Sequence, residues 1–285
     1  MALVQVDFFS TSLMRTVTMS AVVPADRASI ETDGSAHAVA PGDQRPFKTL
    51  YLLHGIYGNH SDWIAHTRIQ ELAEARNLAV IMPSGDNSFY NDRINGSRYG
   101  EFIGRELLEF SRKLFRLSDA RKDTFIGGLS MGGYGATVNA LRHPEAFSHV
   151  IALSSGYRID EPTMLEATYD APGIIGNRAY NDAVLGPLES VRGGENDYDA
   201  LAARVAAGDA PRPRFFMACG TEDGLLGANR AYRETLQGLD FDVEYHEGPG
   251  QHNWKFWDEW IERALGWLPL DEAKAPVSSG NVNID

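Results

Sequence analysis

The stretch Asp123-Thr-Phe-Ile-Gly-Gly-Leu-Ser130-Met-Gly-Gly-Tyr-Gly-Ala136 decides the fold of this chain. Its apolar start predicts the end of a buried strand, and the residues from Met131 to about Leu141 predict a helix. Between them the sequence fits G-x-S-x-G, which between a strand and a helix is the pattern of a nucleophile elbow. Side chains two positions either side of the serine would collide with the crossing strand and helix, so glycine is needed there. A glycine-rich turn that merely packs closely fits the same short pattern, so the interpretation depends on partners elsewhere in the chain.

Apolar runs that alternate with helical segments predict an α/β fold with a mostly parallel, doubly wound sheet. We expect strands at residues 49–53, 78–82, 124–126, 149–153, 214–219 and 241–245, and helices at 59–76, 99–115, 131–141, 229–239 and 254–267. The runs 4–9 and 14–23 are rich in β-branched residues and predict an antiparallel hairpin at the edge of the sheet.

The remaining segments predict a single domain over residues 1–269 with additions. Residues 156–209 contain prolines, glycines and short helical patches without a clear strand, and they predict a cap-like insertion beside the site. The polar segment 24–46 predicts an exposed loop, and 270–285 predicts a flexible C-terminal tail.

An acid and a base follow the serine in the chain. Asp223 comes directly after the predicted strand 214–219, and His252 lies in a glycine-rich loop between the last strand and the last helix. Ligands of open parallel sheets bind beyond the carboxyl ends of the strands, where all three residues fall. The order Ser130, Asp223, His252 is that of α/β-hydrolases, in which histidine takes the serine proton and aspartate orients the histidine.

Each partner has alternatives. Glu222 is adjacent to Asp223, although its position in the turn is less favourable, and Asp197 and Asp199 lie in the irregular insertion. His54 ends a strand near the site but precedes the serine, which favours a role in supporting an oxyanion turn. Cys219 falls inside a strand and is interpreted as a small buried hydrophobe.

Two backbone amides are candidates for an oxyanion hole. The N–H of Met131 lies at a helix N-terminus directly after the serine, where the helix dipole favours negative charge. The second donor is expected from His54-Gly-Ile-Tyr-Gly58, and we assign it to the N–H of Ile56. A plain tight turn between strand and helix is the alternative. Three aromatic residues near these turns are candidates for the substrate pocket or for core packing: Trp63, Phe89 and Tyr90.

Composition excludes several classes of protein. The 285 residues carry a net charge of −13, which argues against nucleic acid or an anionic membrane surface as partner. A single cysteine excludes an intrachain disulfide, and the absence of a signal-like start or a long apolar run predicts a cytoplasmic location. No cluster with metal-ligand spacing is present, so we expect neither metal nor cofactor. The sequence leaves open whether the chain forms a homo-oligomer.

In these motifs the chain resembles the esterase D group of α/β-hydrolases, and within that group the tributyrin or acetyl esterase type. The resemblance covers roughly residues 1–268 and rests on segments 52–58 with Trp63, 83–90, 127–136, 220–223 and 252–254. It implies a serine carboxylesterase in which Ser130, Asp223 and His252 form the triad and the amides of Ile56 and Met131 bind the oxyanion. The loop 24–46 and the acidic tail depart from the group.

The implied substrates are small-molecule esters with short acyl groups, of acetyl or butyryl type, including acylated sugars. An S-formylglutathione hydrolase would use the same machinery on a thioester and is the closest alternative. A non-catalytic binding protein with this fold is the alternative from another class, although such proteins usually lose a member of the triad.

Overall fold

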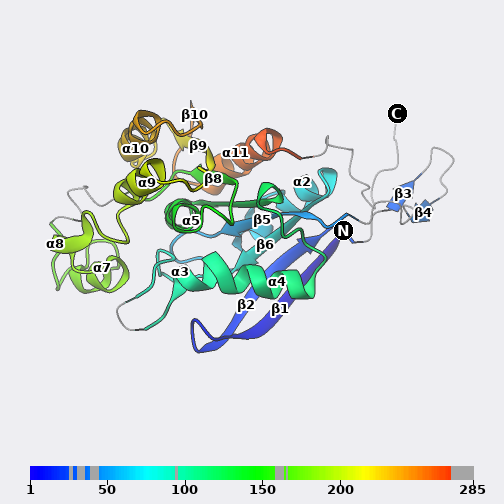
Figure 1. Ribbon diagram of the computed structural model, residues 1–285, viewed down its shortest axis with the longest axis horizontal. Helices are drawn as coiled ribbons and strands as arrows, with labels where there is room; N and C mark the ends of the chain where they lie inside the picture. Colours follow the sequence, from blue (N-terminus) through cyan, green and yellow to red (C-terminus); the bar gives the residue numbers. More distant parts are fainter. Residues whose placement is uncertain are drawn as a thin grey trace.

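The computed structural model describes residues 1–25, 28–30, 36–38, 45–93, 96–157, 164 and 166–270. Its centre is an eight-stranded sheet in the order β1-β2-β6-β5-β7-β8-β9-β10 (Figure 1). The strands are β1 (Ala2–Ser10), β2 (Arg15–Val23), β5 (Lys48–Leu53), β6 (Leu78–Pro83), β7 (Thr124–Leu129), β8 (His149–Leu153), β9 (Arg214–Gly220) and β10 (Val243–Gly248). Strands β1 and β2 form an antiparallel hairpin, and β2 pairs with β6 in antiparallel orientation. The other neighbouring pairs, from β6 through β5 to β10, are parallel. The predicted mostly parallel sheet with an antiparallel edge hairpin is confirmed.

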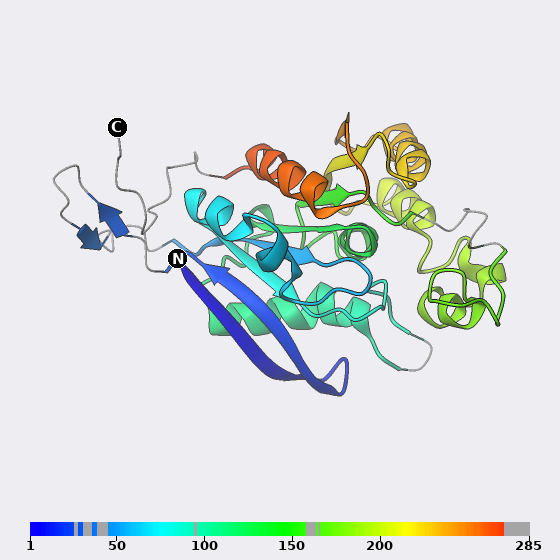
Figure 2. The same ribbon diagram turned by 180° about the vertical axis from the view of Figure 1, so that it is seen from behind.

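Helices cover both faces of this sheet (Figures 1 and 2). One apolar core contains residues of α1 (Asp62–His66), α2 (Ile69–Ala75) and α11 (Trp254–Trp267). The other contains residues of a π-helical segment (Phe102–Glu106), α4 (Leu107–Leu114), α5 (Met131–Arg142), α9 (Tyr198–Ala207) and α10 (Leu226–Gly238). Strand residues alternate between the two cores: Leu50 and Leu52 belong to the first, Tyr51 and Leu53 to the second. Burial on both faces explains why these strands are continuous apolar runs.

The expected helix 59–76 is two short helices. The Thr67 hydroxyl donates to the Trp63 carbonyl, 2.5 Å away, and accepts from the Ile69 N–H at 3.2 Å. The hydroxyl thus takes backbone partners that a continuous helix would use, and the helix is interrupted between α1 and α2. The expected helix 99–115 runs through α3 (Tyr99–Glu101), the π-helical segment and α4.

Other boundaries also differ from the prediction. The last strand begins at Val243 rather than Phe241, because the Phe241 N–H is bonded to the Leu236 carbonyl at the end of α10. Within the expected loop 24–46 the structure contains a short antiparallel pair, β3 (Ala28–Ile30) and β4 (Ala36–Ala38). Residues 26–27, 31–35 and 39–44 of that loop, and 271–285 of the expected tail, lie outside the described residues.

The predicted cap region contains α7 (Arg178–Leu185), α8 (Leu188–Val191) and α9. Figure 1 shows α7 and α8 at one end of the molecule, away from the sheet. In contrast, α9 packs against α5, with Leu201, Ala202 and Val205 in the same core. The last third of the predicted insertion thus covers the sheet, and the single-domain division with a cap stays a prediction.

Glu106 of the π-helical segment holds the turn of the edge hairpin. Its carboxylate accepts from the Ser10 hydroxyl at 2.7 Å, from the Thr11 N–H at 2.6 Å and from the Ser12 N–H at 3.0 Å. Burial alone would raise the pKa of Glu106, but these hydrogen bonds lower it to about 2. A folded-state pKa below the unfolded value means that the ionised carboxylate stabilises the fold above about pH 4.5. That contribution is lost as the pH falls toward 2.

We therefore expect Glu106→Gln to lower the free energy of unfolding by about 1–2 kcal/mol at pH 7, because bonds to a charged acceptor are weakened. The difference from the parent should shrink at pH 3. Urea unfolding at both pH values measures it, with Glu109→Gln, whose exposed carboxylate pairs with Arg105, as control. An equal effect of both substitutions would contradict the role of Glu106.

Candidate active site

Ser130 lies at the sharp turn between β7 and α5. Its φ of 54° is positive, a strained conformation for a residue other than glycine. A β-carbon on Gly132 would lie 2.4 Å from the Leu53 carbonyl oxygen, and one on Gly128 would lie 2.5 Å from the Gly132 oxygen. The close crossing of backbones therefore requires these glycines, as the sequence predicts. The neighbouring chain secures the turn, since the Ser130 N–H donates to the Leu153 carbonyl and the Gly156 N–H donates to the Ser130 carbonyl, both at 2.9 Å.

The three predicted triad side chains meet at the carboxyl ends of the strands. His252 Nε2 lies 3.0 Å from Ser130 Oγ, and His252 Nδ1 lies 2.9 Å from Asp223 Oδ2. The Asp223 side chain is 1% exposed, whereas His252 is 37% exposed at the surface of the site. The His252 ring also packs edge-on against Trp257, with centroids 4.9 Å apart. These contacts fix the imidazole between an accessible hydroxyl and a buried carboxylate.

Electrostatics favour the ionised form of Asp223. Burial disfavours the charge, but hydrogen bonds from His252 and the Leu225 N–H, together with His252 nearby, leave the pKa of Asp223 below its ordinary value. The adjacent Glu222 is exposed and points elsewhere, accepting from the Gly250 N–H at 2.5 Å. Glu222 therefore contacts the loop that carries His252, not the imidazole itself.

His54 orients the predicted oxyanion turn. The Gly85 N–H donates to His54 Nε2 at 2.8 Å, so the proton of the neutral ring is on Nδ1, which donates to the Gly55 carbonyl at 2.6 Å. Burial lowers the pKa of His54 and keeps the ring neutral. In a planar trans peptide the N–H points opposite to the carbonyl. Because the Gly55 oxygen is held by His54, the Ile56 N–H points away from that ring.

The turn also lies beside the nucleophile. A β-carbon on Gly55 would be 3.6 Å from the Ser130 β-carbon. The Met131 N–H is at the first position of α5, where helical N–H groups have no partner within the helix. Over the described residues, neither this amide nor that of Ile56 is bonded to a protein acceptor. Their assignment as oxyanion donors stays a prediction.

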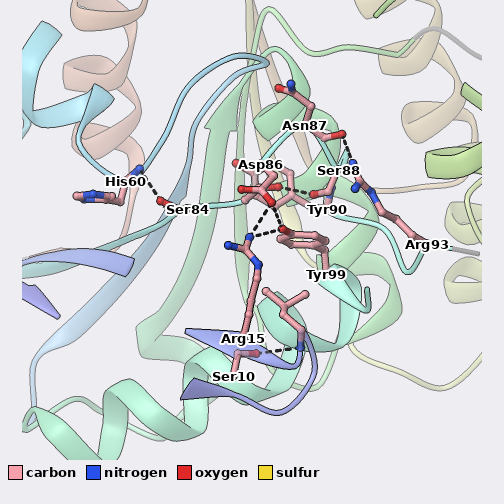
Figure 3. A network of polar contacts seen from close by, with 12 residues as sticks. Ser10, Arg15, His60, Ser84, Asp86, Asn87, Ser88, Tyr90, Arg93 and Tyr99 are labelled. Atoms are coloured by element: carbon pink, nitrogen blue, oxygen red, sulfur yellow. Dashed lines mark hydrogen bonds and ion pairs between the residues drawn. The ribbon is translucent and has the colours of Figure 1, made fainter. Parts of the chain in front are cut away.

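Figure 3 shows a polar network around loop 84–93, the loop whose Gly85 N–H is bonded to His54. In loop 84–93 Asp86, Phe89 and Tyr90 all have positive φ values. The Asp86 carboxylate accepts from Arg15 of the edge hairpin at 2.6 Å and from the Tyr99 hydroxyl at 2.5 Å, which fixes the loop. Sequence analysis did not identify the part played by Arg15, Asp86 and Tyr99. The only local signal is the polar run Asp86-Asn-Ser88 after a strand, which does not reveal its partners.

The three pocket candidates differ in their contacts. The Trp63 indole donates to the Leu53 carbonyl at 3.0 Å, and the Tyr90 hydroxyl donates to the His54 carbonyl at 2.9 Å. Both side chains are buried, and both bonds hold the backbone that leads into the oxyanion turn. Phe89 lies close to the elbow, because a β-carbon on Gly156 would be 3.4 Å from the Ser130 oxygen and 3.6 Å from Phe89 Cε1. The pocket assignment of all three residues stays a prediction.

We expect His54→Ala to lower kcat by about 10²-fold with little change in KM, because the Gly55 carbonyl keeps only its longer bond from the Gly58 N–H and the Ile56 amide is misplaced. Steady-state kinetics with p-nitrophenyl acetate measures this effect, and circular dichroism verifies folding. His60→Ala is the matched control, since His60 is bonded to Ser20 instead. An unchanged kcat in folded His54→Ala would show that the turn holds itself in place.

Within the described ranges, no group of three or more His, Cys, Asp or Glu is placed to hold a metal ion. Of the helices in the described part of the chain, none is long and apolar enough to cross a membrane.

The fold and the Ser–His–Asp arrangement are those of an α/β-hydrolase. Comparison with protein families gives a match over residues 37–268 to the esterase family described as "Putative esterase". The chain is 38% identical to an acetyl esterase of Caldicellulosiruptor saccharolyticus over 269 residues, which cover 94% of this chain and 98% of the relative.

Two solved structures are also similar. One is a fluorophosphonate-binding serine hydrolase of Staphylococcus aureus (TM-score 0.80), and the other is an S-formylglutathione hydrolase of the same species (TM-score 0.78). Each is 29% identical, and each match covers 94% of this chain and 98% of the other. The chain belongs to this esterase family and is a serine carboxylic ester hydrolase. The resemblance to the esterase D group is confirmed.

Proposed function

We propose that this esterase hydrolyses short-chain acyl esters, of acetyl or butyryl type, through an acyl-enzyme on Ser130. The observation that carries the mechanism is the continuous contact from Ser130 Oγ through the His252 ring to Asp223, at 3.0 and 2.9 Å. An imidazole held in this way can take the serine proton as the hydroxyl attacks an ester carbonyl. Buried Asp223 fixes the Nδ1–H tautomer and stabilises the imidazolium that forms.

The remaining steps use the same groups. The amides of Ile56 and Met131 donate to the oxyanion of the tetrahedral intermediate. The His252 imidazolium then protonates the departing alcohol, leaving the acyl group on Ser130 Oγ. Water enters, His252 takes its proton, and a second tetrahedral intermediate collapses to release the carboxylic acid and the free serine.

One observation supports a short acyl group. The curated relative with 38% identity along nearly its whole length is an acetyl esterase. Near the elbow, Phe89 packs edge-on against Tyr134 with ring centroids 5.5 Å apart, and Tyr180 of α7 contacts the Asn87 carbonyl at 2.9 Å. These contacts join the loop after β6 to α5 and to the cap region beside the elbow.

A series of p-nitrophenyl esters tests the proposal. We expect kcat/KM to be highest for acetate or butyrate and at least about tenfold lower for octanoate, because each methylene that the proposed acyl pocket does not accommodate reduces kcat/KM. Highest activity on octanoate would overturn the short-chain assignment. Acetylated sugars belong in the same series, since they would identify the alcohol.

A thioester function is the second candidate, favoured by the similarity to the staphylococcal S-formylglutathione hydrolase. The same enzyme preparation should be assayed on S-formylglutathione and p-nitrophenyl acetate. A kcat/KM for the thioester greater by about 10²-fold or more would replace the carboxylesterase proposal, because such a ratio means specific recognition of that substrate. A non-catalytic binding role would require a folded chain that hydrolyses neither substrate and is not labelled by a fluorophosphonate probe.

A further inference from the structure

A second concave site lies at the opposite end of the sheet from the triad. Its volume is about 630 Å³, and it is bordered by residues at the amino ends of five adjacent parallel strands, β6, β5, β7, β8 and β9. Examples are Asn77 before β6, Lys48 in β5 and Arg214 in β9. We call this site the basal cleft. The triad residues follow the carboxyl ends of strands, so the basal cleft is separate from the catalytic centre.

The basal cleft is strongly basic in an acidic protein. The whole chain has 26 Lys and Arg against 39 Asp and Glu. The residues that line the cleft include seven Lys or Arg and a single carboxylate, Asp123. Like charges gathered around one concavity repel one another, and a concave surface concentrates their field. Such a potential attracts an anion even though the net charge of the protein is negative.

Within the described part of the chain, several of these cations are bonded to backbone carbonyls rather than to carboxylates. Arg121 donates to the carbonyls of Pro144, Pro211 and Arg212, and Arg76 donates to the Leu72 carbonyl. Arg214 forms an ion pair with Asp242, at 2.6 Å. Carbonyl partners hold the guanidinium groups in place without cancelling their charge. The cleft therefore presents positive groups that are already held in place, so binding of an oxyanion costs little side-chain conformational entropy.

A histidine with an unsatisfied ring nitrogen also borders this site. His149, the first residue of β8, is 7% exposed and lines the cleft. Its Nδ1 lies 2.9 Å from the Ser148 hydroxyl, whereas its buried Nε2 has no protein partner. Burial first, and then Arg214 and Arg121, lower the pKa of His149 to about 4, so the ring is neutral at neutral pH. A buried ring nitrogen without a partner is costly unless a ligand or water satisfies it.

We propose that the basal cleft binds a small polyanion that carries phosphate or several carboxylate groups. Lys48, Arg76, Lys122 and the nearby arginines supply the positive charge, and the His149 ring borders them. The volume lies within the range of small-molecule sites and exceeds the needs of one inorganic phosphate. An organic phosphate or a polycarboxylate therefore fits the chemistry and the size.

Isothermal titration calorimetry of the full chain with pyrophosphate, ATP and citrate tests this proposal, with ionic strength held at 150 mM because weak surface attraction is screened there. We expect saturable 1:1 binding of at least one probe with a Kd below about 1 mM. ATP or pyrophosphate binding alone would assign a phosphate ligand, and citrate binding alone a polycarboxylate ligand. No saturable binding of any probe would overturn the proposal.

Variants locate the site. Arg76→Gln/Lys122→Gln should weaken binding by about tenfold, since two charges are removed at the cleft. The control Arg263→Gln removes an exposed charge that does not line the cleft and that pairs with Glu259 on α11. Equal weakening by the control, or none by the double variant, would mean that the anion binds elsewhere. Hydrolysis of p-nitrophenyl acetate verifies folding of each variant and leaves this outcome independent of the proposed function.

Discussion

Ser130→Ala is expected to lower kcat for p-nitrophenyl acetate by about 10⁵–10⁶-fold, because no acyl-enzyme can form without the hydroxyl. The residual rate would come from the oxyanion donors and from substrate binding alone. The same substitution should abolish covalent labelling by a fluorophosphonate probe. Removal of a small, partly exposed hydroxyl leaves the packing of the elbow intact, so the variant should fold like the parent.

Cys219→Ala is the matched control for the nucleophile. Cys219 lies in β9 and is buried, and burial raises the pKa of its thiol to about 12. A thiol that stays protonated is a poor nucleophile, so this variant should keep its activity and its labelling. Retention of activity in Ser130→Ala together with its loss in Cys219→Ala would reverse the assignment of the nucleophile.

The sequence was sufficient for the central strands because β5, β6, β7, β8 and β9 are buried on two faces and are therefore short apolar runs. The elbow could be predicted because Gly128 and Gly132 stand between a strand and a helix, and because an acid and a histidine follow in the expected order. The three residues proposed as the triad could be placed together because each follows a strand, and the carboxyl ends of parallel strands meet. That prediction rested on the order of the three residues along the chain and on the position of each one after a strand.

The features that were missed depend on contacts between distant residues. Arg15 and Asp86 are 71 positions apart, and nothing in either segment indicates that they pair. Likewise, the break at Thr67 is set by one hydroxyl that bonds two backbone groups, which helical periodicity does not reveal. The packing of α9 on α5 is also tertiary, so the composition of the insertion could not separate this helix from α7 and α8.

The choice between two adjacent carboxylates gives the second large prediction. Asp223→Asn should lower kcat by about 10⁴-fold, because an amide next to His252 Nδ1 no longer enforces the tautomer that accepts the serine proton. Glu222→Gln should stay within about tenfold of the parent, since glutamine retains an oxygen that accepts from the Gly250 N–H and touches no reacting group.

Rates on p-nitrophenyl acetate between pH 6 and 9 measure both variants, with fluorophosphonate labelling as a second readout. Asp223→Asn should label far more slowly than the parent while its circular dichroism is unchanged, because attack by Ser130 needs the same base. The opposite result, a severe loss in Glu222→Gln and a mild one in Asp223→Asn, would mean that the two turn residues exchange places when substrate binds. Since burial of Asp223 depends on the 220–223 turn packing against the loop of His252, that exchange would require both segments to move together.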